Sequence, residues 1–208
     1  MAEQKAAFQM SLGFVIGLVF AIVLLSLALV WIRGVFEGFT GLTDDLTQQS
    51  QSALSDTFST TTANFAVWPS NYELKPNTKL IMSAGIDNNA GDGQDHEFVI
   101  NVIPAAASSN VLAARGCSTF DQCPLLKEEM AKWTTFVTSS TLVQISTQGY
   151  RDINIKPAAD AVKGFYIFNV VACYDKGGTG SVPTSGNCVA NSPSLWGCSA
   201  QQITITII

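Results

Sequence analysis

The 208-residue sequence has few charged side chains and almost no histidine. Charged residues make up 13 % of the chain, the net charge is −5, and the one histidine is His96. Nucleic-acid binding requires a basic patch, which this composition argues against. No G-x-S-x-G or other nucleophile motif accompanies the histidine. We therefore expect a non-enzymatic protein without a cofactor, and we interpret His96 as a solvated residue of a hairpin loop.

Zinc-binding and N-glycosylation motifs are also missing. The cysteines form no C-x-x-C pair, the histidine lies far from them in sequence, and no N-x-[ST] sequon occurs. The five cysteines all lie in the second half of the chain, at Cys117, Cys123, Cys173, Cys188 and Cys198. Such a set is typical of disulfides in an oxidising exterior. We expect the first two to close a small loop and one bridge among the other three. The remaining thiol is then either buried or links two subunits.

The sequence does contain one long apolar run, Met10 to Ile32, which has no charged residue. A helix of this length spans roughly 34 Å, enough to cross a hydrocarbon core of about 30 Å. The apolar region of a cleaved secretory signal is usually only about 7–15 residues long, and no A-x-A site follows this run. We predict a short head at residues 1–9, a transmembrane helix at residues 10–33, and a C-terminal part outside the cell.

One face of this helix carries small residues. Gly13, Gly17 and Ala21 are four positions apart, and the first two form a G-x-x-x-G motif. Such a motif lets helix backbones approach closely in an apolar medium. The face therefore predicts helix–helix packing between copies of the chain, although small residues are also common in any membrane helix. The expected partners are the membrane and further copies of the same protein.

Residues 34–62 form a polar connector with helical character. Val35, Phe39, Leu42 and Leu46 recur at spacings of four, three and four, and Leu54 and Phe58 extend the stripe. We predict an amphipathic stalk that continues the membrane helix to about Phe58, with a kink at the glycines. The stripe either packs on the following domain or meets a neighbouring copy. The threonines in "STTT", residues 59–62, end the helix.

Residues 63–208 read as a β domain. Short segments rich in β-branched and aromatic residues alternate with Gly, Pro, Asn and Asp, which predicts an antiparallel β-sandwich of seven or so strands. "HEFVINVIP" is expected to stop at its proline. "QITITII" points Ile203, Ile205 and Ile207 inward. One insert, residues 105–132, interrupts the pattern and contains a short helix around Leu125 to Lys132.

Two loops of this domain are candidate binding sites. "DNNAGDGQDHE" offers oxygen ligands for calcium, but the spacing of an EF-hand fails, and we favour a metal-free turn. The calcium candidates are Asp87, Asn89, Asp92 and Asp95. Trp196 lies in the excursion formed by residues 173–198, where it is either a partner contact or a hydrophobic plug beside a disulfide. We favour the plug. A surface protein or glycan as partner is left open.

The β domain resembles the Ig-like, CARDB-like modules of archaeal surface proteins. The resemblance rests on "LIMSAGIDNNAGDGQDHEFVINV", "QGYRDINIKPAADAVKGFYIFNVVA" and the last strand. It covers roughly residues 63–208 without the insert, and it implies an Ig-like fold. Such folds support many functions.

The N-terminus resembles archaeal type IV pilins and archaellins, whose precursors carry a short polar leader, a basic residue before the cut and about 20 apolar residues. The resemblance implies cleavage around Lys5, Ala6, Ala7 and Phe8, although this leader is short and singly basic. It also implies a subunit that self-assembles through its helix into an extracellular filament. The alternative is an uncleaved, single-pass anchor that displays an Ig-like domain for adhesion or docking.

Overall fold

The structure is a computed structural model that describes residues 3–61, 63–89, 92–175, 184–196 and 200–208. The side chains of residues 3–12 and 33–47 lie outside this description. The chain divides into two compact units, Met1–Asp45 and Leu46–Ile208. The first unit is helical, and the second contains the last turns of that helix and the β domain.

The predicted membrane helix and stalk are one element, α1, which runs from Glu3 to Thr60 without interruption. The glycines of the connector therefore do not break the helix. The helix ends in the threonine run, as predicted. Thr60 Oγ1 donates to Asp56 O at 2.8 Å, and Thr61 Oγ1 donates to Thr57 O at 2.8 Å. Thr57 O also accepts from Thr61 N at 3.0 Å, so each hydroxyl bonds back to a carbonyl one turn earlier, as Ser and Thr side chains commonly do near a helix end.

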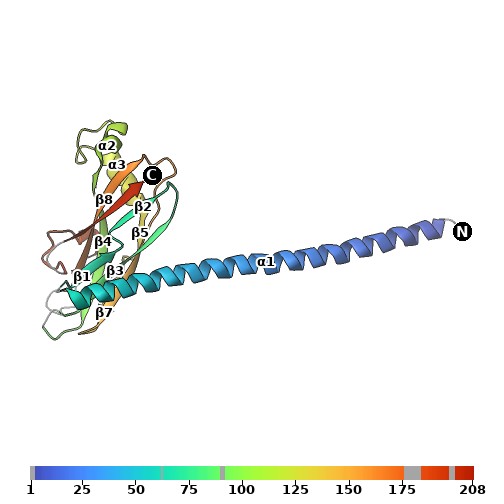
Figure 1. Ribbon diagram of the computed structural model, residues 1–208, viewed down its shortest axis with the longest axis horizontal. Coiled ribbons are helices and arrows are strands. Elements are labelled where there is room, and N and C mark those ends of the chain that lie inside the picture. Colours follow the sequence, from blue (N-terminus) through green and yellow to red (C-terminus); the bar gives the residue numbers. More distant parts are fainter. Residues whose placement is uncertain (1–2, 62, 90–91, 176–183, 197–199) are drawn as a thin grey trace. The chain divides into compact units, whose positions relative to one another are not determined.

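Nine strands are described in the second unit, and they form two sheets (Figure 1). The four-stranded sheet has the order β1-β3-β7-β5, with β1 Phe65–Trp68, β3 Leu80–Asp87, β7 Gln148–Ile155 and β5 Thr134–Phe136. The five-stranded sheet has the order β2-β9-β8-β4-β6, with β2 Asn71–Leu74, β9 Gln201–Ile207, β8 Gly164–Tyr174, β4 His96–Ala107 and β6 Thr141–Val143. The fold is an Ig-like β-sandwich, as predicted.

One strand pair differs from the expected antiparallel arrangement. β2 pairs with β9 in parallel, whereas every other pairing between these strands is antiparallel. β1 and β2 are separated by only two residues, and they belong to different sheets. The chain therefore crosses between the sheets at the cis Trp68–Pro69 bond. It enters the five-stranded sheet in the same direction as β9.

The proline in "HEFVINVIP" does not end its strand, so that prediction is wrong. β4 continues through Pro104 to Ala107, and its pairing with β8 shifts register between Pro104 and Ala106. Proline has no N–H to donate to a ladder, and a bulge lets the strand pass such a residue. The strand therefore reaches α2 without a break.

The core lies between the two sheets. The four-stranded sheet contributes Met82, Ile86, Ile153 and Ile155, and the five-stranded sheet contributes Phe98, Ile100, Phe168, Ile203, Ile205 and Ile207. Alternation places the odd-numbered isoleucines of β9 inside and its threonines outside, as predicted. Burying each such side chain stabilises the fold by about 1.5–3 kcal/mol relative to exposure.

The insert forms two short helices, α2 Ser109–Ala114 and α3 Pro124–Trp133, which gather at one end of the sandwich (Figure 1). α3 is the predicted short helix, and Pro124 occupies its first turn, where a missing N–H costs nothing. Val111 of α2 and Met130 of α3 are buried in the main core. The insert is therefore a packed part of the domain.

Candidate functional sites

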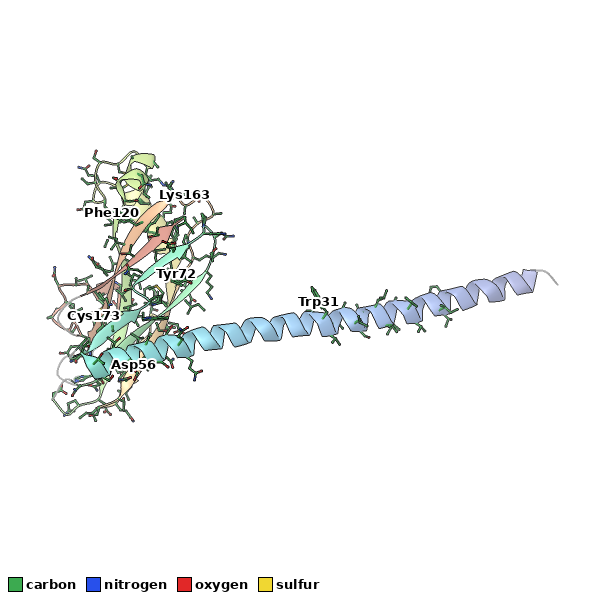
Figure 2. All side chains as sticks on the ribbon, viewed as in Figure 1. Trp31, Asp56, Tyr72, Phe120, Lys163 and Cys173 are labelled. Carbon is green, nitrogen blue, oxygen red and sulfur yellow. A yellow bond between two sulfur atoms is a disulfide. The ribbon has the colours of Figure 1, made fainter. Side chains whose placement is uncertain are left out.

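The most exposed apolar surface of the described chain lies on α1. Gly13–Ile32 is a 20-residue stretch with a mean hydropathy of 3.0, and none of it is buried. Trp31, labelled in Figure 2, is 72 % exposed, and Phe20 is 66 % exposed. Twenty apolar residues in a helix suffice to cross a membrane. A helix of this composition fits a membrane anchor, a signal sequence or the inside of a helix bundle.

The predicted packing face lies within this stretch. Gly13, Gly17 and Ala21 are helical and exposed. A Cβ built on either glycine meets nothing within 4 Å, so the two positions are open to a close neighbour. The candidate cleavage residues Lys5, Ala6, Ala7 and Phe8 belong to α1, but their side chains lie outside the described residues.

The last turns of α1 pack on the outer face of the four-stranded sheet. Leu54 and Phe58 are buried together with Ala66 of β1, and Tyr150 of β7 packs against them. Gly85 of β3 makes this approach possible, because a Cβ there would lie 3.0 Å from Phe58 Cε2 and 3.2 Å from Leu54 Cδ1. For Leu54 and Phe58, packing on the β domain is therefore confirmed. The rest of the stripe, residues 35–46, lies outside the described side chains.

His96 is buried between two aspartate side chains. Its side chain is 0 % exposed, so the prediction of a solvated loop histidine is wrong. Nδ1 lies 3.1 Å from Asp175 Oδ1, and Nε2 lies 2.8 Å from Asp92 Oδ2. Asp175 follows β8, whereas Asp92 belongs to the turn between β3 and β4. Three chain segments therefore meet at one imidazole ring.

Two aromatic rings complete this cluster. Tyr174 and Trp196 pack edge-on against His96, with centroid separations of 5.1 Å and 5.5 Å. Trp196 is 2 % exposed and belongs to the main core. Its burial fits the hydrophobic plug favoured by the sequence better than a surface contact through the ring. We call Asp92, His96, Tyr174, Asp175 and Trp196 the histidine cluster.

Electrostatics favour the charged form of His96. Burial alone would lower the pKa of the imidazole, but the hydrogen bonds and negative charges of Asp92 and Asp175 outweigh it, so the pKa is raised above its usual value. The pKa of Asp92 is lowered, chiefly by the hydrogen bond from the Gln94 backbone N–H and then by the bond to His96. Opposite charges thus stabilise one another across the cluster.

The side chains of two calcium candidates, Asp92 and Asp95, are held by other contacts. Asp92 accepts from His96 and from Gln94 N, and Asp95 Oδ1 accepts from Ile145 N at 2.8 Å. Asn89 N donates to Asp87 O within the turn. Among the described residues, no three His, Cys, Asp or Glu side chains converge in a way that could hold a metal. The calcium alternative therefore gains no geometric support.

Two disulfides hold the irregular segments. Cys117 and Cys123 close the small loop of the insert, as predicted. Cys173 pairs with Cys188, 15 residues apart, and Cys173 is labelled in Figure 2. Cys198 lies outside the described residues. The second bridge covers the outer face of the five-stranded sheet, where it packs with Val99 and Val171. Asn101 Nδ2 fastens the same segment by donating to Cys188 O at 3.0 Å.

The comparisons with known proteins show no family. No protein-family model matches the chain, and no curated protein matches it. Solved structures do show similarity. The PapD-like domain 7 of human CEP192 has a TM-score of 0.41 and 8 % identity, covering 70 % of this chain and 86 % of that one.

Two bacterial structures are similar at the same level. A family 123 glycoside hydrolase from Clostridium perfringens has a TM-score of 0.40 and 8 % identity, covering 66 % of this chain and 22 % of that one. A chain of the Coh-OlpA-Doc918 cohesin–dockerin complex from Clostridium thermocellum has a TM-score of 0.33 and 10 % identity, covering 70 % and 99 %. These likenesses concern the β-sandwich alone.

Proposed function

We propose that this protein is a non-enzymatic surface subunit that assembles through α1 into an extracellular, pilin-like or archaellin-like filament. The observation that carries the proposal is a contrast within α1. Leu54 and Phe58 are buried by their own domain, whereas Gly13–Ile32 is exposed along its whole length. An apolar helix of this size needs a partner that its own chain does not supply.

Several features support copies of the chain as that partner. The small face at Gly13, Gly17 and Ala21 suits close helix–helix contact in an apolar environment. The order of apolar helix, stalk and β-sandwich matches the plan of the filament subunits that the N-terminus resembles. The two disulfides suit a domain that lies outside the cell. In such a filament the helices bury one another, and the sandwiches form the outer layer.

A permanent anchor is the second candidate. The hydropathy of Gly13–Ile32 by itself meets the requirement for a single membrane pass, without any contact between copies. The sandwich would then be displayed singly for adhesion or for docking a partner. The two functions differ in whether residues 1–6 are removed and in whether the small face is needed.

The first experiment is the intact mass of the native protein recovered from the cell surface. A mature chain that starts at Ala7 or Phe8 supports processing followed by filament assembly. A chain that retains residues 1–6, with or without Met1, supports the anchor and contradicts the cleavage part of the proposal.

A pair of variants tests the helix-packing part. Gly13→Leu with Gly17→Leu fills the small face, so we expect filaments to disappear while the sandwich still folds. Ser26→Leu is the matched control, because Ser26 lies on the opposite side of the helix at about 100° per residue. Its hydroxyl donates only to Ile22 O within α1. Abundant filaments in the double variant, counted by electron microscopy, would refute packing through this face.

A further inference from the structure

The histidine cluster joins segments that are far apart in the sequence. Asp92 comes from the β3–β4 turn, and Asp175 directly follows β8, 79 residues beyond His96. Trp196 comes from the end of the described part of the same excursion. His96 itself lies at the first position of β4, where it pairs with Val143 of β6. Whatever changes the charge of the ring acts on the turn and the excursion together.

The hydrogen-bond geometry favours a cationic ring. An aspartate carboxylate only accepts, so each ring nitrogen must carry a proton in order to bond its partner. Both nitrogens have such a partner, at 3.1 Å and 2.8 Å. A neutral imidazole carries one proton and can satisfy only one of them, leaving a lone pair against the other carboxylate. The arrangement therefore fits imidazolium and opposes the neutral ring.

The other groups around the ring do not supply a competing charge. Tyr174 from β8 is the remaining titratable neighbour, while Val143 from β6 and Trp196 from the excursion do not ionise. Glu97, next in the chain, accepts from Ser140 Oγ at 2.7 Å instead. Asp95 is bonded to Ile145 N. The charge state of the cluster thus depends on His96, Asp92 and Asp175.

The two carboxylates are held unequally. Asp175 is 6 % exposed, and its Oδ1 also accepts from Glu97 N at 3.0 Å. Asp92 is 44 % exposed, and its Oδ1 accepts from Gln94 N at 3.1 Å within the same turn. Water can replace His96 as a partner for Asp92 more easily than for the buried Asp175. Loss of a ring proton is therefore expected at Nε2.

We propose that His96 forms a pH-dependent contact between residues 92–95 and the core of the sandwich. As imidazolium, the ring holds Asp92 in place. When the ring loses the Nε2 proton at alkaline pH, Nδ1–H stays on Asp175, Asp92 turns to solvent, and its bond from Gln94 N–H is lost. Strong acid breaks the same contact by protonating Asp92. The surface presented by residues 92–95 would thus depend on the pH outside the cell.

The test uses the full-length protein in detergent micelles with ¹⁵N-labelled histidine. Because the chain has one histidine, the ring gives one pair of nitrogen resonances. We expect both nitrogens to be protonated at pH 6.5 and Nε2 to deprotonate above the midpoint of an unperturbed histidine, near 6.5. The protection factor of the Gln94 amide should fall about tenfold through the same transition, as expected when a hydrogen bond to a charged group is lost.

Two substitutions separate loss of the His96–Asp92 contact from a general effect of removing a carboxylate nearby. Asp92→Asn removes the exposed partner and should move the histidine midpoint down while lowering protection of Gln94 at neutral pH. Asp95→Asn removes a carboxylate of the same turn that is bonded to Ile145 N, and it should leave the midpoint in place. A neutral ring at pH 6.5 in the unmodified protein overturns the proposal. The proposal is also overturned if the two variants have equal histidine midpoints, or if protection of the Gln94 amide does not change through the transition.

Discussion

The two units of this chain differ in how far their described apolar side chains are buried. In residues 46–208, both sheets, the insert and the last turns of α1 bury most of their described apolar side chains against one another. In Gly13–Ile32, a stretch of higher hydropathy, every residue is exposed. The described part of the first unit buries none of its apolar side chains within the chain, whereas the second unit buries most of its own. Substitutions should therefore act on solubility or assembly in one unit and on folding stability in the other.

The largest contrast comes from the same substitution at two places in α1. Phe58→Ala removes a ring that is 6 % exposed, and we expect it to lower the free energy of unfolding by about 4 kcal/mol. Phe20→Ala removes a ring that is 66 % exposed, and the sandwich should unfold as before, within about 0.5 kcal/mol. Chemical denaturation of both proteins in micelles, followed by near-UV circular dichroism, measures the difference. Equal losses would mean that the two regions do not differ in this way.

Removal of the longer disulfide should also act on the second unit alone. Replacing Cys173 and Cys188 by serine frees a loop of 15 residues, and loop-closure entropy predicts a loss of about 3 kcal/mol. The pair Cys117 and Cys123, six residues apart, should cost less when replaced in the same way. Melting temperatures of the two double variants give the order. A melting temperature unchanged in both would show that the bridges do not hold the folded domain.

Gly85→Ala tests how the end of α1 packs on the sheet within the second unit. The added methyl group would lie 3.0 Å from Phe58 Cε2, so the docked end of α1 must move, at a cost of about 1 kcal/mol. The same change in a Phe58→Ala background should cost nothing, because the crowded atom is gone. A double-mutant cycle of unfolding free energies measures this coupling. If the two losses of unfolding free energy are additive, the cost of Gly85→Ala does not come from its contact with Phe58.

The smallest expected effect is a pH dependence of the second unit. The folded pKa of His96 is raised above its unfolded value, so its contribution to stability is complete below about pH 6.5 and is lost as the pH rises through the folded pKa. The pKa of Asp92 is lowered, so its contribution is present above its unfolded pKa and is lost in strong acid. Urea midpoints between pH 6 and pH 9 should therefore decline. Asp92→Asn should flatten that decline, and a flat profile in the unmodified protein contradicts the prediction.

Much of the fold could be predicted from periodicity. The alternation in "QITITII" placed Ile203, Ile205 and Ile207 in the core, and the threonine run marked the end of α1. These signals are local, because a period of two or a change in helix propensity is visible within a few residues. The parallel pairing of β2 and the passage of β4 through Pro104 depend on which strand lies alongside, which local patterns do not contain.

The histidine cluster was missed for the same reason. Within the sequence, His96 stands among Gly, Asp and Gln, which is typical of a solvated loop. Its burial comes from Asp175 and Trp196, both more than 70 residues away. A charged residue following the apolar strand "GFYIFNVVACYD" was the one available signal, since Asp175 comes shortly after the buried run from Val170 to Cys173. The packing face of α1 could be proposed from spacing alone, and its partner stays a prediction.

The Cys117–Cys123 bridge has a further consequence for a domain exposed to proteases. The loop between the two cysteines is largely exposed, with Ser118, Thr119, Asp121 and Gln122 on the surface. Exposed loop tips are preferred sites of nicking. Here a cut between the cysteines breaks the backbone but not the molecule, since the bridge still joins the two pieces and the flanking helices remain packed through Val111 and Leu126. A nicked copy therefore stays one covalent molecule, heavier only by the water added in the cut, until the bridge is reduced.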